Sequence, residues 1–225
     1  MGAIVNSIVV VITSLIGLLI GQRIPEKMNR AIMQGIGLVV ITSGVSGAEN
    51  GVNTLVLILS MVIGIVIGEG LDIHQRINLF IEKATKRLSG DKDQSEFTQA
   101  FMTATMLFCI GSMAIVGSLE SGLTGDNATL YTKSVIDGIS AVLFSSSLGI
   151  GVLFASIPLL LYQGSLIIFA QLLAPILSDA VILEMTTVGS VLLIGMGLNM
   201  LDITDFKMMN FIPAIFLPIL LMLFL

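Results

Sequence analysis

The chain has 225 residues, of which 55% are hydrophobic and 11% are charged. Soluble globular domains usually carry about 25% charged residues, so this composition excludes a soluble domain and indicates a chain that lies in a lipid bilayer. The formal net charge is −5, and the single cysteine excludes both an intrachain disulfide and a cysteine-based zinc cluster.

Apolar runs that can cross roughly 30 Å of hydrocarbon need about 20 residues each, and the chain holds eight. In chain order they cover 2–21, 31–48, 52–69, 98–119, 132–151, 153–176, 181–201 and 208–225. The first run lacks a basic leading region and a cleavage signature, so we expect a retained span. No polar turn separates the fifth run from the sixth, which predicts a tight apolar hairpin or a re-entrant bend at Gly149–Gly151 or before Pro158.

The basic residues predict the orientation of these spans. Nine of the ten fall on one side if there are eight spans, and only Lys133 falls on the other. Because Lys and Arg gather on the cytoplasmic side, both termini are expected outside the cytoplasm. The opposite face collects the acidic residues Glu49, Glu120, Asp126, Asp179 and Glu184.

Polar landmarks recur in the same order about 130 residues apart. The offsets are 137 − 6 = 131 for Asn6 and Asp137, 158 − 25 = 133 for two prolines, 163 − 34 = 129 for Gln34 and Gln163, and 202 − 72 = 130 for two aspartates. This pattern predicts an all-α, polytopic membrane bundle with two parallel three-helix repeats, made of spans one to three and five to seven. Chance recurrence in a low-diversity apolar sequence is the alternative.

We therefore expect one membrane domain over residues 1–225, divided into five parts. They are a first repeat (1–73), a cytoplasmic amphipathic connector (74–97), a linking span with an outer loop (98–131), a second repeat (132–203) and a terminal span (204–225). Between the third and fourth apolar runs, apolar residues from Ile73 to Leu88 fall at helical spacing beside basic residues, which is typical of a helix on a membrane surface. An ordinary connector whose basic residues only fix the topology explains the same pattern.

Ionisable side chains inside the hydrocarbon cost roughly 2.5–3.5 kcal/mol at its centre, so each one needs a partner, water or a shallow position. Asp137 lies one helical turn after Lys133, where an i,i+4 ion pair can form. Such a pair can be purely structural. Alternatively, Asp137 is a coupling carboxylate, and its repeat equivalent Asn6 shares the same cavity.

Other polar residues inside spans could line a solute path. Glu69 is a second candidate coupling carboxylate. An equally good explanation is that Glu69 lies at the end of a helix, where its side chain reaches the water of the lipid headgroups. Gln34 and Gln163 each precede a glycine, where an amide can contact a solute or join two helices. The full set of candidate solute-binding residues is Asn6, Gln34, Ser145, Ser146, Gln163 and Asn199.

No nucleophile with a base, no paired histidines and no metal or phosphate-binding motif occurs, so we expect no enzymatic activity, no cofactor and no nucleic-acid partner. Glycine pairs with GxxxG spacing, Gly17 with Gly21 and Gly64 with Gly68, permit close helix contacts within one chain or in a homo-oligomer.

Several segments resemble a bacterial membrane family known as domain of unknown function 554. They are Phe108–Ser118, Gly122–Asp126, Lys133–Gly138, Leu148–Val152, Tyr162–Gly164 and Gly195–Asn199, with Asn6–Ser7 and Met33–Gly35 at the other end. Family members usually have proline where Ser112 stands and Gln-Asp where Glu120-Ser121 stands, so this chain departs from the pattern there. The resemblance implies a multi-pass protein of the bacterial inner membrane and brings no substrate.

Together these features favour a small secondary transporter for a small polar solute or ion, coupled to a proton or cation through Asp137 and Glu69. A passive channel is the alternative within transport. A non-transporting membrane scaffold or sensor, which binds lipid or a partner through the basic connector, is the alternative from another class.

Overall fold

The computed structural model describes residues 1–21, 25–77, 79 and 94–224, and within these ranges it contains helices and no strand. The chain is therefore the all-helical protein that the sequence predicts. Most of the predicted amphipathic connector lies outside the described residues, because only 74–77, 79 and 94–97 of it are described. The helices in chain order are α1 (Gly2–Gly21), α2 (Glu26–Ala48), α3 (Thr54–Leu71), α5 (Gln94–Cys109), α6 (Ser112–Leu123), α7 (Ala128–Leu148), α8 (Gly151–Phe154), α9 (Ser156–Ile168), α10 (Ala170–Leu173), α11 (Asp179–Met200), η1 (Met208–Phe211) and α12 (Pro213–Leu221).

Five helical stretches among the described residues are long and apolar enough to cross a membrane. They are Gly2–Gly21, Arg30–Ala48, Thr54–Leu71, Gly151–Ile168 and Asp179–Met200. A sixth is obtained if Phe97–Cys109 and Ser112–Leu123, which meet at 59°, count as one broken span, while Met208–Leu221 is apolar but shorter. The chain thus has several helices that can span a membrane, and the number eight stays a prediction.

Two glycines set the breaks between helices in the middle of the chain. Gly111, between α5 and α6, has a φ of 134°, and Gly149, after α7, has a φ of 88°. Residues that have a Cβ atom strongly disfavour positive φ angles, whereas glycine adopts them readily. Glycine therefore permits the chain to break its helix and turn at both positions, and no proline is needed. The fourth predicted span is therefore broken even though serine occupies position 112. The apolar turn after the fifth span lies at Gly149, one of the two places that the sequence indicates.

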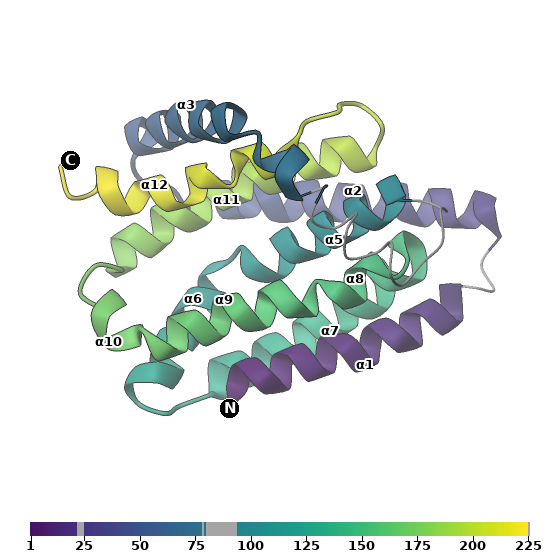
Figure 1. Ribbon diagram of the computed structural model, residues 1–225, viewed down its shortest axis with the longest axis horizontal. Coiled ribbons are helices and arrows are strands. Elements are labelled where there is room, and N and C mark those ends of the chain that lie inside the picture. The colour runs from purple at the N-terminus through teal and green to yellow at the C-terminus, as the bar shows by residue number, and fades with distance from the viewer. Residues whose placement is uncertain (22–24, 78, 80–93, 225) are drawn as a thin grey trace. The chain divides into compact units, whose positions relative to one another are not determined.

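The chain divides into two compact units, which we describe separately. Unit 1 comprises 1–35 and 99–178, and unit 2 comprises 36–98 and 179–225. In unit 1, α1 runs parallel to α7 and lies against it along its length (Figure 1). The Cα of Gly2 faces Leu130 near the start of α7, and the Cα of Gly17 faces the Val142 carbonyl and Ser145 near its end. Glycines thus permit the two helix backbones to approach closely.

The faces that α1 and α7 bury correspond to each other in the predicted repeat. The buried residues of α1 are Gly2, Ala3, Asn6, Ser7, Val10, Ser14 and Gly17. Adding 131 to the first six numbers gives Lys133, Ser134, Asp137, Gly138, Ala141 and Ser145, all of which are buried on α7. The remaining face of α1 exposes apolar side chains, namely Ile4, Ile8, Ile12, Leu15 and Leu19. An apolar face of this length indicates contact with lipid.

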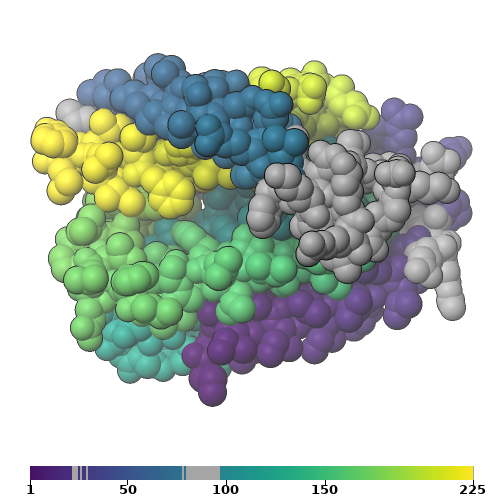
Figure 2. All heavy atoms as spheres, in the orientation of Figure 1, coloured from purple at the N-terminus to yellow at the C-terminus, as the bar shows by residue number. Residues whose placement is uncertain are grey.

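In unit 2, α11 is more buried than α2 or α3. The second half of α2 lies against α11, and α3 lies against η1 and α12. Gly37 of α2 faces the Gly197 carbonyl and Gly44 faces Ser190, so this part of α2 runs antiparallel to α11. Gly64 and Gly68 of α3 lie against Ala214 and Asn210. Figure 2 shows the side chains of α3 lying directly on those of α12.

Candidate functional site

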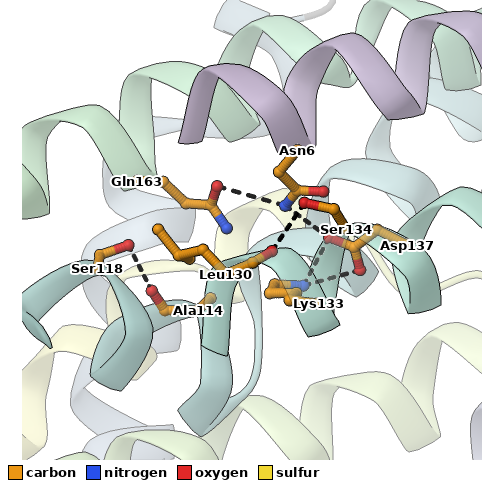
Figure 3. A network of polar contacts seen from close by, with 8 residues as sticks. All are labelled: Asn6, Ala114, Ser118, Leu130, Lys133, Ser134, Asp137 and Gln163. Atoms are coloured by element: carbon orange, nitrogen blue, oxygen red, sulfur yellow. Dashed lines mark hydrogen bonds and ion pairs between the residues drawn. The ribbon is translucent and has the colours of Figure 1, made fainter. Parts of the chain in front are cut away.

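Four polar side chains from three helices of unit 1 meet in the interior: Asn6 of α1, Lys133 and Asp137 of α7, and Gln163 of α9 (Figure 3). We call them the polar cluster. Their exposed fractions are 0% for Asn6 and Gln163, 6% for Lys133 and 4% for Asp137. After the turn at Gly149 the chain continues through α8 into α9, which lies against α1 and α6. This packing brings Gln163 within hydrogen-bond distance of Asn6.

An ion pair forms the centre of the polar cluster. The Lys133 ammonium nitrogen Nζ lies 2.8 Å from Oδ1 and 2.7 Å from Oδ2 of Asp137, so it donates to both carboxylate oxygens. The i,i+4 pair that the sequence predicts is thus present, and it is buried. Burying two charges costs several kcal/mol per ion, so apolar residues of similar volume in this place are often neutral or more stabilising.

Asn6 connects the ion pair to Gln163. Its amide nitrogen Nδ2 donates to Asp137 Oδ2 at 2.9 Å and to Gln163 Oε1 at 3.3 Å. Each of the two amides keeps one buried polar atom without a hydrogen-bond partner, Oδ1 of Asn6 and Nε2 of Gln163. Buried polar atoms are nearly always bonded to protein or water, so a water molecule or a polar solute can bond to the cluster at these two atoms.

Two further titratable groups of the described residues interact with the polar cluster or with each other, and neither is a carboxylate. Cys109 of α5 interacts electrostatically with Lys133 and Asp137, and Tyr162 of α9 interacts with Cys109. The carboxylate of Glu120 on α6 accepts from Thr129 Oγ1, one helical turn before Lys133. The neighbouring hydroxyls of Ser134 and Ser118 donate to carbonyls of their own helices, those of Leu130 and Ala114. These two serines therefore lie near the polar cluster, but their hydroxyls do not bond to the ion pair.

Ser145 and Ser146, predicted to contact solute, use their hydroxyls locally. Ser145 is buried under Gly17 and donates to the Ala141 carbonyl at 2.6 Å. Ser146 donates to the Leu143 carbonyl at 2.8 Å. Such bonds to the preceding turn of the same helix are common for serine and need no ligand.

Three other predicted site residues lie elsewhere in the described structure. Gln34 is exposed on α2, and no hydrogen bond of the described residues joins it to the polar cluster. Glu69, in unit 2, is exposed near the end of α3. Asn199, also in unit 2, holds the loop after α11: its Oδ1 accepts from Phe206 N and Thr204 Oγ1, and its Nδ2 donates to the Phe206 carbonyl.

A buried carboxylate in unit 2 was not among the predicted site residues. Glu184 of α11 is 2% exposed, and its Oε1 accepts from the backbone nitrogens of Val52 at 3.0 Å and Asn53 at 2.9 Å. Its Oε2 is buried with no hydrogen-bond partner. The sequence placed Glu184 among the acids of the outer face. The available signal was the spacing, since 184 − 53 = 131 is the offset that also separates Asn6 from Asp137.

Replacing Glu184 by alanine should destabilise unit 2, because two backbone N–H groups at the start of α3 lose their acceptor. We expect the free energy of unfolding to fall by about 1–3 kcal/mol, which thermal unfolding in detergent followed by circular dichroism would measure. Glu49→Ala is the matched control, since Glu49 is exposed at the end of α2, and it should change stability by less than about 0.5 kcal/mol. Equal effects of the two changes would contradict this role.

No three His, Cys, Asp or Glu side chains of the described ranges lie close enough together to hold a metal ion.

Comparison with known proteins gives a consistent result along the chain. Residues 1–223 match the family described as "Protein of unknown function (DUF554)". The chain is 30% identical over 221 residues to the "Uncharacterized membrane protein YdfK" of Bacillus subtilis (strain 168), which covers 96% of this chain and 93% of that protein. It is 32% identical over 219 residues to the "Uncharacterized protein YqgA" of Escherichia coli (strain K12), with the same coverage of each chain. No solved structure matches.

Proposed function

This chain belongs to the DUF554 family, and we propose that it is a small secondary transporter of the bacterial inner membrane that moves a small polar solute or ion. The observation that carries the proposal is the polar cluster. It holds a buried Lys133–Asp137 ion pair and two amides with unused polar atoms inside a bundle of apolar helices. Ionisable residues inside membrane helices are costly, and they mark ion and solute pathways.

A structural role alone explains the cluster less well. A buried ion pair is weak evidence for stability, because apolar side chains can fill the same volume without the cost of desolvation. The two unused amide atoms add to that cost. A group that must gain or lose a proton or a ligand during function, in contrast, requires polar partners of this kind.

The proposed parallel duplication is consistent with the transport proposal. The parallel helices α1 and α7 bury residues related by the offset 131, and Asn6 and Asp137 meet directly at this spacing. Transporters often consist of two related repeats that rock against each other, with the binding site between helices of the two repeats. In our proposal α1 and α7 are the first helices of the two repeats, and Asp137 is the coupling group between them.

Proton-coupled uptake in liposomes tests the proposal. The purified protein is first screened by thermal shift against amino acids, carboxylates, sugars and inorganic ions, and the solutes that stabilise it are offered to proteoliposomes containing a pH-sensitive dye. Coupled uptake should fall at least tenfold in Asp137→Asn, which corresponds to about 1.4 kcal/mol. Asp205→Asn changes an exposed aspartate and should leave uptake unchanged.

The outcomes separate the alternatives. Solute flux that needs no proton movement and persists in Asp137→Asn would indicate a passive channel. Absence of flux for every stabilising solute would reject transport and favour a scaffold or sensor.

A further inference from the structure

The two amides of the polar cluster are oriented by the charge of Asp137. A carboxylate only accepts hydrogen bonds, so Asn6 must turn its Nδ2 toward Oδ2, and this nitrogen then also donates to Gln163 Oε1. The unused atoms are consequently an acceptor on Asn6, Oδ1, and a donor on Gln163, Nε2. The Asp137 carboxylate thus sets the orientation of the Asn6 amide, and the Asn6 amide sets the orientation of the Gln163 amide.

Protonation of Asp137 on Oδ2 would reverse the orientation of both amides. The new O–H group is a donor, and two donors cannot face each other, so Asn6 would present Oδ1 in place of Nδ2. Oδ1 would then accept from Asp137 and from Gln163, provided that Gln163 also turns and presents Nε2. The terminal torsions of asparagine and glutamine are roughly two-fold, so both amides can rotate by about 180° within the same volume.

We propose that the polar cluster is a proton-driven amide switch, in which Asn6 transmits the protonation of Asp137 to Gln163 and thereby exchanges the donor and acceptor that the two amides present. With Asp137 charged, the unused atoms are the Asn6 carbonyl oxygen and the Gln163 amino group. With Asp137 protonated, they are the Asn6 amino group and the Gln163 carbonyl oxygen. A polar solute held by one arrangement is not held in the same pose by the other.

The chemistry of the step is a simple protonation. A hydronium ion transfers one proton to Oδ2 of Asp137: an O–H bond of hydronium breaks, water is left, and an O–H bond forms on Asp137. Oδ1 keeps its hydrogen bond from Lys133. The charge of the cluster rises from zero, the sum of one ammonium and one carboxylate, to +1. Among the described residues, Cys109 on α5 interacts with the ion pair and Tyr162 on α9 interacts with Cys109. Glu120 on α6 bonds to Thr129, one turn before Lys133, and α1 carries no titratable residue.

The same geometry selects a proton over a metal cation as the coupling ion. Protein sites for hard cations use several oxygen ligands at once. In the polar cluster both oxygens of Asp137 accept from Lys133, and Oδ2 also accepts from Asn6. The Gln163 oxygen accepts from Asn6 as well. Asn6 Oδ1 is therefore the one side-chain oxygen of the cluster that accepts no hydrogen bond and could bind a cation. The Lys133 ammonium already occupies the position of a cation. This inference rests on the proposed function and refines it.

A pH titration by nuclear magnetic resonance tests the switch in the full-length protein in lipid nanodiscs, with protons as the only ligand. Side-chain amides of Asn and Gln carry nitrogen-15, and the carboxyl carbon of Asp carries carbon-13. The Asn6 and Gln163 signals should shift with the same midpoint as the Asp137 carboxyl carbon. The exposed amide of Gln34 serves as an internal control and should not follow that midpoint.

Two variants test the order of transmission. In Asp137→Asn, the pH-dependent shifts of both amides should be lost. In Asn6→Leu, Asp137 should still titrate while Gln163 no longer follows it, because Asn6 is the residue that bonds to both. If Asn6→Leu does not fold, the wild-type titration still tests the switch, because it compares the midpoints of Asp137, Asn6 and Gln163.

The switch is overturned if the Gln163 signal stays constant while Asp137 titrates, or if Asp137 stays charged at every pH at which the protein is folded. Continued response of Gln163 in a folded Asn6→Leu protein would overturn it too. The titration requires no transport, so the two proposals can fail separately. Joint titration without flux would retain the switch and reject the transporter, whereas Asp137-dependent flux without joint titration would reject the switch.

Discussion

Replacing Asp137 by leucine is expected to lower the free energy of unfolding by about 3–5 kcal/mol, because it leaves the buried Lys133 ammonium without its counter-charge. Asn6 Nδ2 also loses an acceptor, which adds to the effect in the same direction. Thermal unfolding in detergent can be followed through the reaction of the single thiol, Cys109, with a maleimide dye as the protein opens.

The double variant Lys133→Met/Asp137→Leu is the informative control. It removes both charges and keeps most of the volume, so its stability should return to within about 1 kcal/mol of the wild type, and it should remain inactive in coupled uptake. This separation of stability from activity distinguishes a functional ion pair from a structural one. A double variant as unstable as Asp137→Leu would show that the pair itself stabilises the fold, and would weaken the case for transport.

Replacing Gly17 by alanine is expected to destabilise unit 1 by about 1–3 kcal/mol. A Cβ at this position would collide with the Val142 carbonyl oxygen and with Ser145 Oγ. The serine hydroxyl can rotate away, but the carbonyl belongs to the backbone of α7, so the two helices would have to separate. Thermal unfolding of the variant in detergent measures the loss.

Gly164→Ala on α9 is the matched control for Gly17→Ala. A Cβ at Gly164 would meet nothing within 4 Å, and alanine is the better helix former by roughly 0.5–1 kcal/mol, so this change should leave stability unchanged or raise it. Similar losses in the two variants would mean that the close approach of α1 and α7 does not limit stability.

The membrane character and helical class follow from composition and run length, which do not depend on tertiary contacts. The same holds for the apolar turn at Gly149 and for the Lys133–Asp137 pair, since a glycine in a positive-φ turn and an i,i+4 contact are local features. Asn6 and Gln163 were identified because polar atoms inside an apolar run are costly wherever the helix lies.

Gln34 and Gln163 show where this reasoning stops. Both are glutamines before a glycine in an apolar run, and they occupy equivalent places in the predicted repeat, yet Gln34 is exposed and Gln163 is fully buried. The local sequences around the two glutamines are too similar to predict which one is buried. The difference comes from the helices that surround each one, which no local pattern encodes.

Glu184 shows the opposite case, because its charge and its place near a helix end predict a solvated residue. The fold instead buries its carboxylate against the backbone of Val52 and Asn53, more than 130 residues away. The break between α5 and α6 similarly occurs at Gly111 without the proline expected for the family, because glycine alone permits the required φ.

Composition and apolar run length thus predict a bundle of apolar helices, in which polar residues, Asp137 above all, require an explanation. Which of those residues meet depends on how the helices pack: Asn6 and Gln163 join the ion pair, while Gln34 does not. The physical reason is one of range. The cost of placing a polar group in hydrocarbon depends on the residue and its helix, and the Lys133–Asp137 pair is likewise local. The bonds of Asn6 to Asp137 and Gln163 join helices more than 100 residues apart in the chain, and packing brings these helices together.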